Sequence, residues 1–191
     1  MRTLFFFTFL AVFAFETNAQ DIQKMELKPN GFVGNDSTKN YIVIEIPTKK
    51  QNELYKSALV YLSSIYRNPQ NVITSVENES IIINGMTESI IGDLKWYKYR
   101  LYYNINIQFK DGKMKFEPTI TDFIEIYSEN KERKIYVANS DSPNEAEINC
   151  IWMTGESKLT FLLKEDLKLS TENWLNGYLS SLIEGMTNDD W

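Results

Sequence analysis

The alternation of apolar and polar side chains is strongest between positions 96 and 109, and it predicts one long β-strand. One face carries Tyr97, Tyr99, Leu101, Tyr103, Ile105, Ile107 and Phe109, and the other carries Trp96, Lys98, Arg100, Tyr102, Asn104, Asn106 and Gln108. Side chains of a strand point alternately to its two faces, so this period of two indicates a strand with one buried face. Asp111-Gly112 then predicts a tight hairpin turn, because both central residues of such a turn take a positive φ.

The return strand has a less regular pattern. Continuous alternation puts one apolar set in register, namely Met114, Phe116, Ile120, Ile124 and Ile126. Asp122 shares this register, so we expect its side chain to point inward unless the register changes after Pro118. Because Pro118 has no N–H to donate to the ladder, it predicts a bulge or a free edge.

Three shorter strands are predicted earlier, at residues 40–46, 72–77 and 80–84. Ile42, Ile44 and Ile46 share one face of the first, and β-branched residues favour strands. Residues 85–93 are ambiguous: Ile90 and Ile91 either extend the third strand or belong to a loop.

An amphipathic helix is predicted after Pro47. Thr48-x-x-Gln51 fits a capping box, and the Asn68-Pro69 break predicts an end near Arg67. Its apolar stripe consists of Leu54, Ala58, Leu59, Tyr61, Leu62 and Ile65.

A second amphipathic helix is predicted at the C-terminal end, with Ser170 or Thr171 as its cap. Its stripe consists of Leu175, Tyr178, Leu179, Leu182, Ile183 and Met186. The segment before it is less defined. A helix from Ser142 to Met153 competes with a strand at Ile148–Met153, and residues 158–169 fit no single element.

This order of elements predicts an α+β fold, an antiparallel β-sheet with two or three α-helices packed on one face. We expect a single domain over residues 40–191, with an extra segment at 128–169. Residues 20–39 are polar and contain Pro29, and we expect an extended lead-in with one short strand at Met25–Leu27.

Residues 1–19 have the pattern of a signal peptide. Arg2 gives a positive start, and Leu4–Phe15 is apolar apart from Thr8. This run is too short for a transmembrane helix, which needs about 20 residues. We expect cleavage near Ala19 and a periplasmic or secreted protein. A buried N-terminal helix and a retained membrane anchor are the alternatives.

The composition excludes several functions. The 191 residues include no histidine and one cysteine, with 26 acids against 20 bases and a net charge of −6. Catalytic systems that depend on histidine are therefore absent, as is an internal disulfide. An acidic chain is poorly suited to nucleic acid, whose binding relies on Lys and Arg. We expect no cofactor.

The best candidate binding surface is the polar face of the long strand. Trp96, Lys98, Arg100 and Tyr102 lie on it, with Lys113 and Lys115 expected on the hairpin partner. Aromatic and cationic side chains together bind sugars or acidic peptides. The alternative is a solvated face whose cross-strand pairs only stabilise the sheet.

Without histidine, carboxylates are the groups that could serve as general acid or base. Glu117, Asp122 and Glu125 are close in sequence, and a buried carboxyl can act as an acid. Residues 139–145 carry oxygens that suit calcium but lack EF-hand spacing, and helix capping explains them equally well. We expect no metal site. Cys150 is most simply a small buried apolar residue.

Several local motifs resemble one known family. These are Tyr41–Pro47, Leu54-Tyr55-Lys56-Ser57-Ala58, Ile81–Gly85 and Lys110-Asp111-Gly112-Lys113. Together they are similar to the DUF4468 family over roughly Tyr41 to Ile126. The resemblance implies a TBP-like fold with the order β-α-β-β-β-β-α and an exported protein of a Gram-negative bacterium. It implies no site residues, because the family has no assigned function.

These observations favour a non-enzymatic binding or interaction domain in the bacterial envelope, with an unknown envelope protein, peptide or glycan as its partner. The first alternative is a carboxylate-dependent hydrolase that uses Asp122 or Glu117. The second is an inhibitor or structural partner of another envelope protein.

Overall fold

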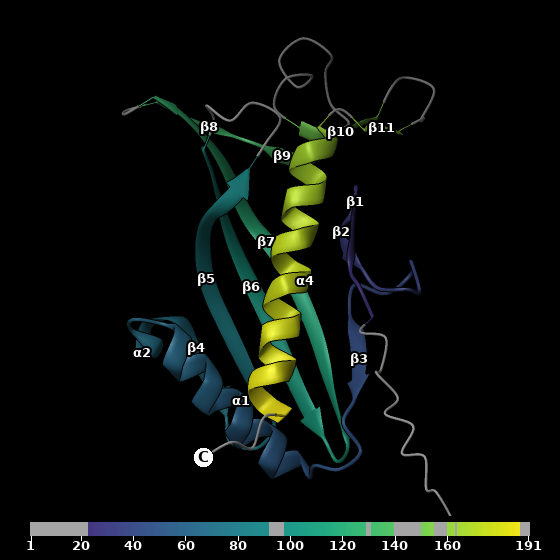
Figure 1. Ribbon diagram of the computed structural model, residues 1–191. Coiled ribbons are helices and arrows are strands. Elements are labelled where there is room, and N and C mark those ends of the chain that lie inside the picture. Colours follow the sequence, from purple (N-terminus) through teal and green to yellow (C-terminus); the bar gives the residue numbers. More distant parts are fainter. Residues whose placement is uncertain are drawn as a thin grey trace, which may run out of the picture.

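The α+β prediction is confirmed by the computed structural model, which describes residues 23–91, 98–128, 131–139, 150–154, 160–162 and 164–187. Its main sheet has six antiparallel strands (Figure 1). Their order is β3 (Ile42–Glu45), β7 (Lys113–Ser128), β6 (Lys98–Lys110), β5 (Ser80–Ile91) and β4 (Ile73–Val76), with β8 (Lys131–Lys134) also paired to β7.

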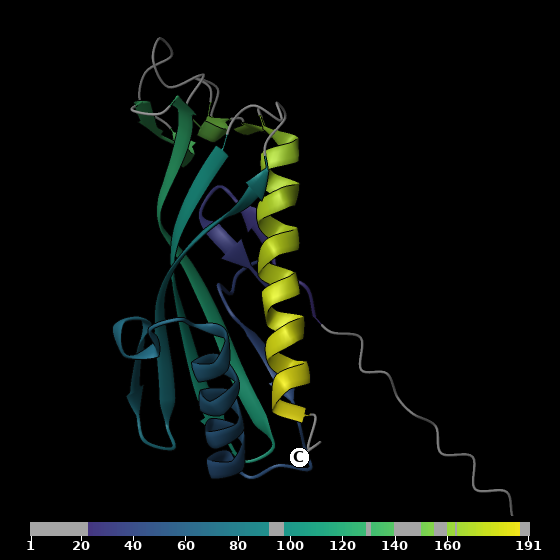
Figure 2. The same ribbon diagram turned by 60° about the vertical axis from the view of Figure 1, so that its left-hand side comes forward.

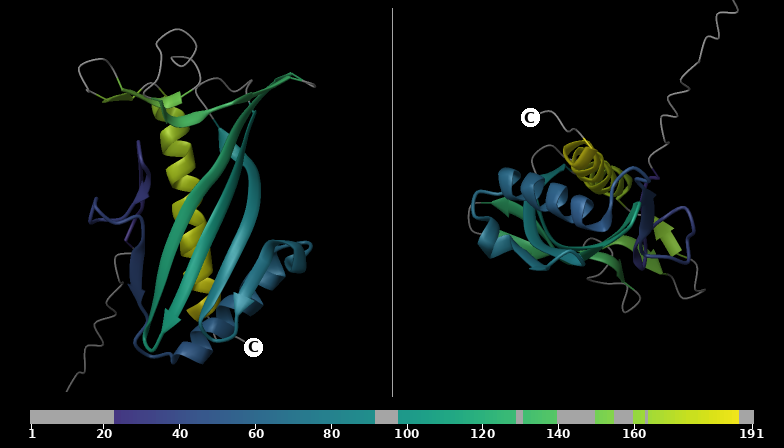
Figure 3. Two further views of the ribbon diagram at one scale, coloured as in Figure 1. Left: turned by 180° about the vertical axis from the view of Figure 1, so that it is seen from behind. Right: turned by 90° about the horizontal axis from the view of Figure 1, so that it is seen from below.

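Two helices cover one face of this sheet and leave the other face open (Figure 2). They are α1 (Gln51–Ile65) and α4 (Glu165–Thr187), and the short α2 (Pro69–Val72) leads into β4. The helices lie side by side on the concave side of the curved strands (Figure 3). The chain order β3-α1-β4-β5-β6-β7-α4 is the predicted order.

The smaller strands form two further sheets. β1 (Glu26–Lys28) pairs with β2 (Gly31–Val33), and β9 (Tyr136–Asn139) and β11 (Thr160–Leu162) flank β10 (Cys150–Thr154). The strand alternative is therefore confirmed at residues 150–153, while residues 142–149 lie outside the described chain.

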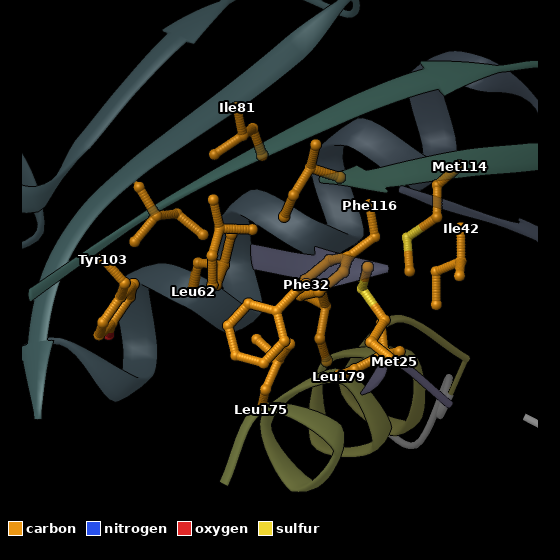
Figure 4. Close-up of a cluster of buried hydrophobic side chains, with 14 of the residues drawn as sticks. Met25, Phe32, Ile42, Leu62, Ile81, Tyr103, Met114, Phe116, Leu175 and Leu179 are labelled. Carbon is orange, nitrogen blue, oxygen red and sulfur yellow. The ribbon is translucent and has the colours of Figure 1, made fainter. Parts of the chain in front are cut away.

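The predicted register of β6 is confirmed. Its odd-numbered side chains from Tyr99 to Phe109 are buried beneath the helices, and its even-numbered ones lie on the open face. The buried set forms one core with side chains from α1, α4, β5 and the N-terminal hairpin (Figure 4). β5 extends to Ile91, so Ile90 and Ile91 belong to the strand.

The predicted register of β7 is wrong beyond Ile120. Tyr103 pairs with Ile120 and Tyr102 with Asp122, so Thr121 is one extra residue, a β-bulge. A single extra residue moves every later side chain to the opposite face. Asp122 therefore lies on the open face, where Ile124 and Ile126 also lie, while Phe123 and Glu125 are buried.

Pro118 lies on a free edge, as predicted. β3 pairs with β7 only as far as Phe116, and β8 begins its pairing at Ile124. No described strand covers the edge between them, so the missing N–H of Pro118 costs no hydrogen bond there.

The cap of α1 lies two residues later than predicted and has an additional partner from another part of the chain. The helix begins at Gln51, and the N–H of Lys50 donates to Glu53 Oε2 at 2.7 Å. Asp111, in the β6–β7 turn, accepts the N–H of Gln51 at 3.0 Å. The predicted box of Thr48 and Gln51 is therefore wrong.

The α1 stripe is partly confirmed. Leu54, Ala58 and Leu62 are buried as predicted, and Tyr55 joins them. Ile65 is 44% exposed, and it is the last residue of the helix, close to the predicted end near Arg67.

The start of α4 also differs from the prediction. The helix begins at Glu165, so Ser170 and Thr171 lie within it. Thr171 is buried, and its hydroxyl donates to the carbonyl of Leu167 at 2.7 Å. The predicted stripe is confirmed at its central positions, Leu175, Leu179, Leu182 and Met186.

The lead-in contributes to the core. Met25, Leu27 and Phe32 of the β1–β2 hairpin are buried. Glu172 of α4 accepts the N–H of Leu27 at 2.7 Å, and the side chain of Asn176 bonds to both backbone groups of Met25. Among the described helices none is long and apolar enough to cross a membrane.

Candidate functional site

The candidate surface is the face of the main sheet opposite the helices, which we call the open face. It is built on the even-numbered residues of β6 from Lys98 to Gln108 and on the residues that lie opposite them in β5 and β7. None of the described helices lies on this face, as the rear view shows (Figure 3).

Three of the four predicted site residues are described, and they lie on this face in one row. Lys98 is exposed, and Arg100 and Tyr102 are half-buried. Trp96 lies outside the described residues. Tyr102 pairs with Met86 on one side and Asp122 on the other, so it lies near the middle of the sheet.

Arg100 is held between two carboxylates. Its Nε donates to Glu88 Oε1 at 2.9 Å, and its Nη1 donates to Glu132 Oε1 at 3.1 Å. The bond to Glu88 raises the pKa of Arg100 above its ordinary value. Because these acids neutralise the guanidinium, it offers little attraction to an anionic ligand.

Two other cations of the open face are paired in the same way. Lys134 lies 3.1 Å from Asp122, and Lys115 lies 2.7 Å from Glu117. Lys115 Nζ also lies 4.3 Å from the ring centroid of Tyr41. Acids that the sequence order does not place beside them thus balance part of the expected cationic surface, namely Arg100, Lys115 and Lys134.

The middle of the open face is uncharged. Met86 is 49% exposed beside Tyr102, and Ile82 is half-buried opposite Asn106. Asn104 Nδ2 donates to Asn84 Oδ1 at 2.8 Å, which joins β6 to β5 across the centre. The face therefore combines an aromatic ring, a thioether and amides with a rim of ion pairs.

The three candidate carboxylates each have a fixed partner. Glu117 accepts from Asn40 Nδ2 at 2.9 Å as well as pairing with Lys115. Asp122 accepts the backbone N–H of Phe123 at 3.1 Å. These two lie on the open face.

Glu125 instead points into the sheet's buried side. It is 1% exposed, accepts from the Tyr99 hydroxyl at 2.9 Å and pairs with Arg133. The bulge thus separates Glu125 from Asp122, so they do not form a facing pair.

Other candidates are weaker. Within the described ranges, no cluster of three or more Cys, Asp or Glu residues is arranged to hold a metal ion. Cys150 is buried, as predicted. Residues 140–145 of the possible calcium loop lie outside the described chain.

Sequence reasoning missed one groove, of about 390 Å³, beside the free edge of β7. Its lining comes from the β1–β2 hairpin, the segment before β3, β7 and β9, and includes Asn30, Phe32, Asn40, Pro118, Thr119 and Val137. These segments are far apart in the sequence, so no local motif could have indicated the groove.

One family model matches part of the chain. Residues 41–123 match the family model described as a domain of unknown function (DUF4468) with TBP-like fold. No curated protein matches the chain.

Two solved structures are similar in fold. A TBP-like protein from Parabacteroides distasonis superposes with a TM-score of 0.55 at 14% identity, covering 78% of this chain and 92% of the other. A DUF4468 family protein from Bacteroides ovatus superposes with a TM-score of 0.50 at 13% identity, covering 78% of this chain and 86% of the other. At this identity the likeness shows the fold alone.

Proposed function

We propose that this chain, which belongs to the DUF4468 family with its TBP-like fold, is an exported, non-enzymatic interaction domain of the bacterial envelope. Its open face binds a protein partner. The signal-peptide pattern of residues 1–19 supports the export, with cleavage near Ala19 and a periplasmic or cell-surface location.

The observation that carries this proposal is the position of Tyr102. Its ring lies half-buried between Met86 and Asp122 at the middle of a sheet face without a described helix on it. Tyr, Met and Arg are enriched in protein interfaces, while unpaired charge is depleted from their centres. The centre of the open face has this composition, because Arg100, Lys115 and Lys134 around it are paired with acids.

The same charge pairing distinguishes a protein partner from an anionic one. Arg100 already binds Glu88 and Glu132, and Lys115 already binds Glu117. An acidic glycan or nucleic acid would have to displace these carboxylates to reach Arg100 or Lys115. An uncharged, partly apolar protein surface matches the open face better.

The hydrolase alternative has less support. Glu117 and Asp122 are each neutralised by a lysine, and the buried Glu125 is occupied by Tyr99 and Arg133. A general acid or base needs a group that is free to exchange a proton with a substrate.

The test compares Tyr102→Ala with a matched variant at another exposed tyrosine. Tyr136, on β9, is 46% exposed and lies outside the main sheet, so Tyr136→Ala serves as the control. Each protein is used to capture envelope proteins under mild cross-linking, and the captured proteins are quantified by mass spectrometry.

We expect at least one protein to be lost with Tyr102→Ala and retained with Tyr136→Ala. Retention of every captured protein by Tyr102→Ala would overturn the proposal. Circular dichroism confirms that each variant is folded. Sequencing the N-terminus of the protein recovered from the periplasm tests export separately, since cleavage near Ala19 is expected.

A further inference from the structure

The outer edge of β5 lacks a partner strand over much of its length. β4 pairs with β5 only from Ser80 to Ile83, while β5 continues to Ile91. Within the described residues no strand lies beside the remainder, which forms the margin of the sheet above β4 (Figure 1).

The hydrogen-bond phase shows which backbone groups face outward. The N–H of Phe109 donates to the carbonyl of Glu79 at 2.9 Å, so Glu79 and every second residue after it bond to β6. Asn84 and Met86 lie in the opposite phase, and their N–H and C=O groups therefore point to the outer edge. The bulge after Thr87 ends this regular stretch.

The chemistry of this edge favours pairing. Natural edge strands are commonly protected by lysine, proline or bulges. Asn84–Thr87 contains no charge and no proline, and protection is limited to the bulge beyond it. Met86, an apolar side chain that is 49% exposed, lies within this segment.

We propose that two copies of this chain pair antiparallel through this edge, with a two-fold axis at Met86. Each Met86 then lies opposite its counterpart, and the segment Asn84–Thr87 of one copy lies beside that of the other. The outward N–H and C=O groups of each Met86 bond to those of its counterpart, so the edge is complementary to itself.

The net charge favours this site over the rest of the surface. Each copy carries a net charge of −6, so two copies repel one another over most approaches. The segment Asn84–Thr87 is uncharged, and Glu88 is neutralised by Arg100 at 2.8 Å. Backbone pairing there brings the two sheets together without close contact of unpaired acids.

Pairing would make one continuous sheet from the two main sheets. Tyr102 lies next to Met86 in the ladder, so the two open faces would join with a Tyr102 on each side of the Met86 pair. This inference does not depend on the proposed protein partner, because the dimer forms through the backbone edge of β5, whereas the partner binds side chains of the open face, of which Met86 is one.

The first test measures the oligomeric state. The protein is purified as the cell processes it, and its mass in solution is determined by light scattering and sedimentation over a range of concentrations. We expect a dimer that Met86→Lys converts to a monomer. Val60→Lys, at a 54% exposed position on α1, is the matched control and is expected to remain dimeric.

A second test keeps the strand edge intact. Opposed residues of a hydrogen-bonded antiparallel pair have Cα atoms about 5.5 Å apart, within the range of about 4.4–6.8 Å that a disulfide spans. Met86→Cys is therefore expected to form a cross-linked dimer under mild oxidation, whereas Val60→Cys and the wild type, whose Cys150 is buried, do not. A monomeric wild type at every concentration, a dimeric Met86→Lys or failure of the Met86→Cys variant to cross-link would each overturn the inference.

Discussion

The ring of Tyr103 occupies the space that a β-carbon on Gly85 would need. The two residues lie directly opposite one another in the β5–β6 ladder. The ring is held in place, because its hydroxyl lies 3.1 Å from that of Tyr66 and its centroid lies 4.8 Å from that of Trp174. Gly85 is thus needed for close approach rather than for an unusual φ.

Gly85→Ala is expected to destabilise the domain by about 1–3 kcal/mol, the usual cost of overpacking a core. Chemical denaturation measures this change in the free energy of unfolding. Gly177→Ala is the control, because nothing lies within 4 Å of the added β-carbon on that helical residue. It is expected to stabilise the protein by up to about 1 kcal/mol. If the clash is the cause, Gly85→Ala costs less in a Tyr103→Val background than in the wild type.

Asn176 joins α4 to the N-terminal hairpin. It accepts the N–H of Met25 at 2.8 Å and donates to the carbonyl of Met25 at 2.9 Å. Asn176→Leu leaves both backbone groups unpaired, and we expect a loss of about 1–3 kcal/mol. Hydrogen exchange should become faster at Met25 and Leu27. Asn173→Leu, at an exposed position of the same helix, is the control and should leave the exchange rates of Met25 and Leu27 unchanged. Equal exchange rates in the Asn176 and Asn173 variants would contradict the role of Asn176 in holding the hairpin.

Glu125 and Arg133 form a partly buried ion pair, in which the Glu125 side chain is 2% exposed and the Arg133 side chain 32%. Removing the cation leaves a buried carboxylate without its main partner. Arg133→Met is therefore expected to cost about 2–3 kcal/mol, below the value of about 3–5 for a fully buried pair. The double variant Glu125→Leu with Arg133→Met should be more stable than Arg133→Met alone, as thermal unfolding can show. If the double variant is less stable than Arg133→Met alone, the unpaired Glu125 carboxylate is not the cause of the loss.

Asp36 is expected to titrate well below the usual range. The Thr38 hydroxyl donates to Asp36 Oδ1 at 2.6 Å, and with Lys39 it lowers the pKa of Asp36 to about 2. A folded pKa below the unfolded value of about 3.9 means that the ionised carboxyl stabilises the fold above that pH. This contribution is lost as the pH falls through about 2.

Carboxyl NMR titration measures the pKa of Asp36 directly. Thr38→Ala removes the largest cause of the shift, so the pKa is expected to move up toward its ordinary value. Ser37→Ala, which changes the neighbouring hydroxyl, is the control and should leave the midpoint unchanged. An unchanged midpoint in Thr38→Ala would show that the hydroxyl is not responsible.

The pattern of apolar and polar residues correctly predicted those elements in which the pattern is uninterrupted. β6 alternates without interruption, so its buried and open faces could be assigned residue by residue. The faces of β7 could not be assigned in this way beyond Thr121. A bulge is defined by the pairing with the neighbouring strand, and the apolar–polar alternation of β7 does not indicate it. One residue of slip exchanged the places of Asp122 and the buried Phe123.

In the candidate site, too, positions within one strand were predictable and contacts between strands were not. Lys98, Arg100 and Tyr102 were placed correctly on one face, since they are two residues apart in a strand. The acids that neutralise Arg100 were not predicted, because Glu88 and Glu132 come from other strands. The cap that Asp111 gives to Gln51 was missed for the same reason.

By itself, the sequence determined the α+β class, the long β6 strand with its two faces, and the absence of chemistry that requires histidine. These properties depend on composition and on contacts between residues close in the chain. The register of β7, the charge pairs of the open face and the burial of Met25 and Leu27 depend on the packed fold and could not be derived from local pattern. Each of these arises from contacts between distant segments, and the free energy of such contacts depends on positions that only the packed sheet and helices define.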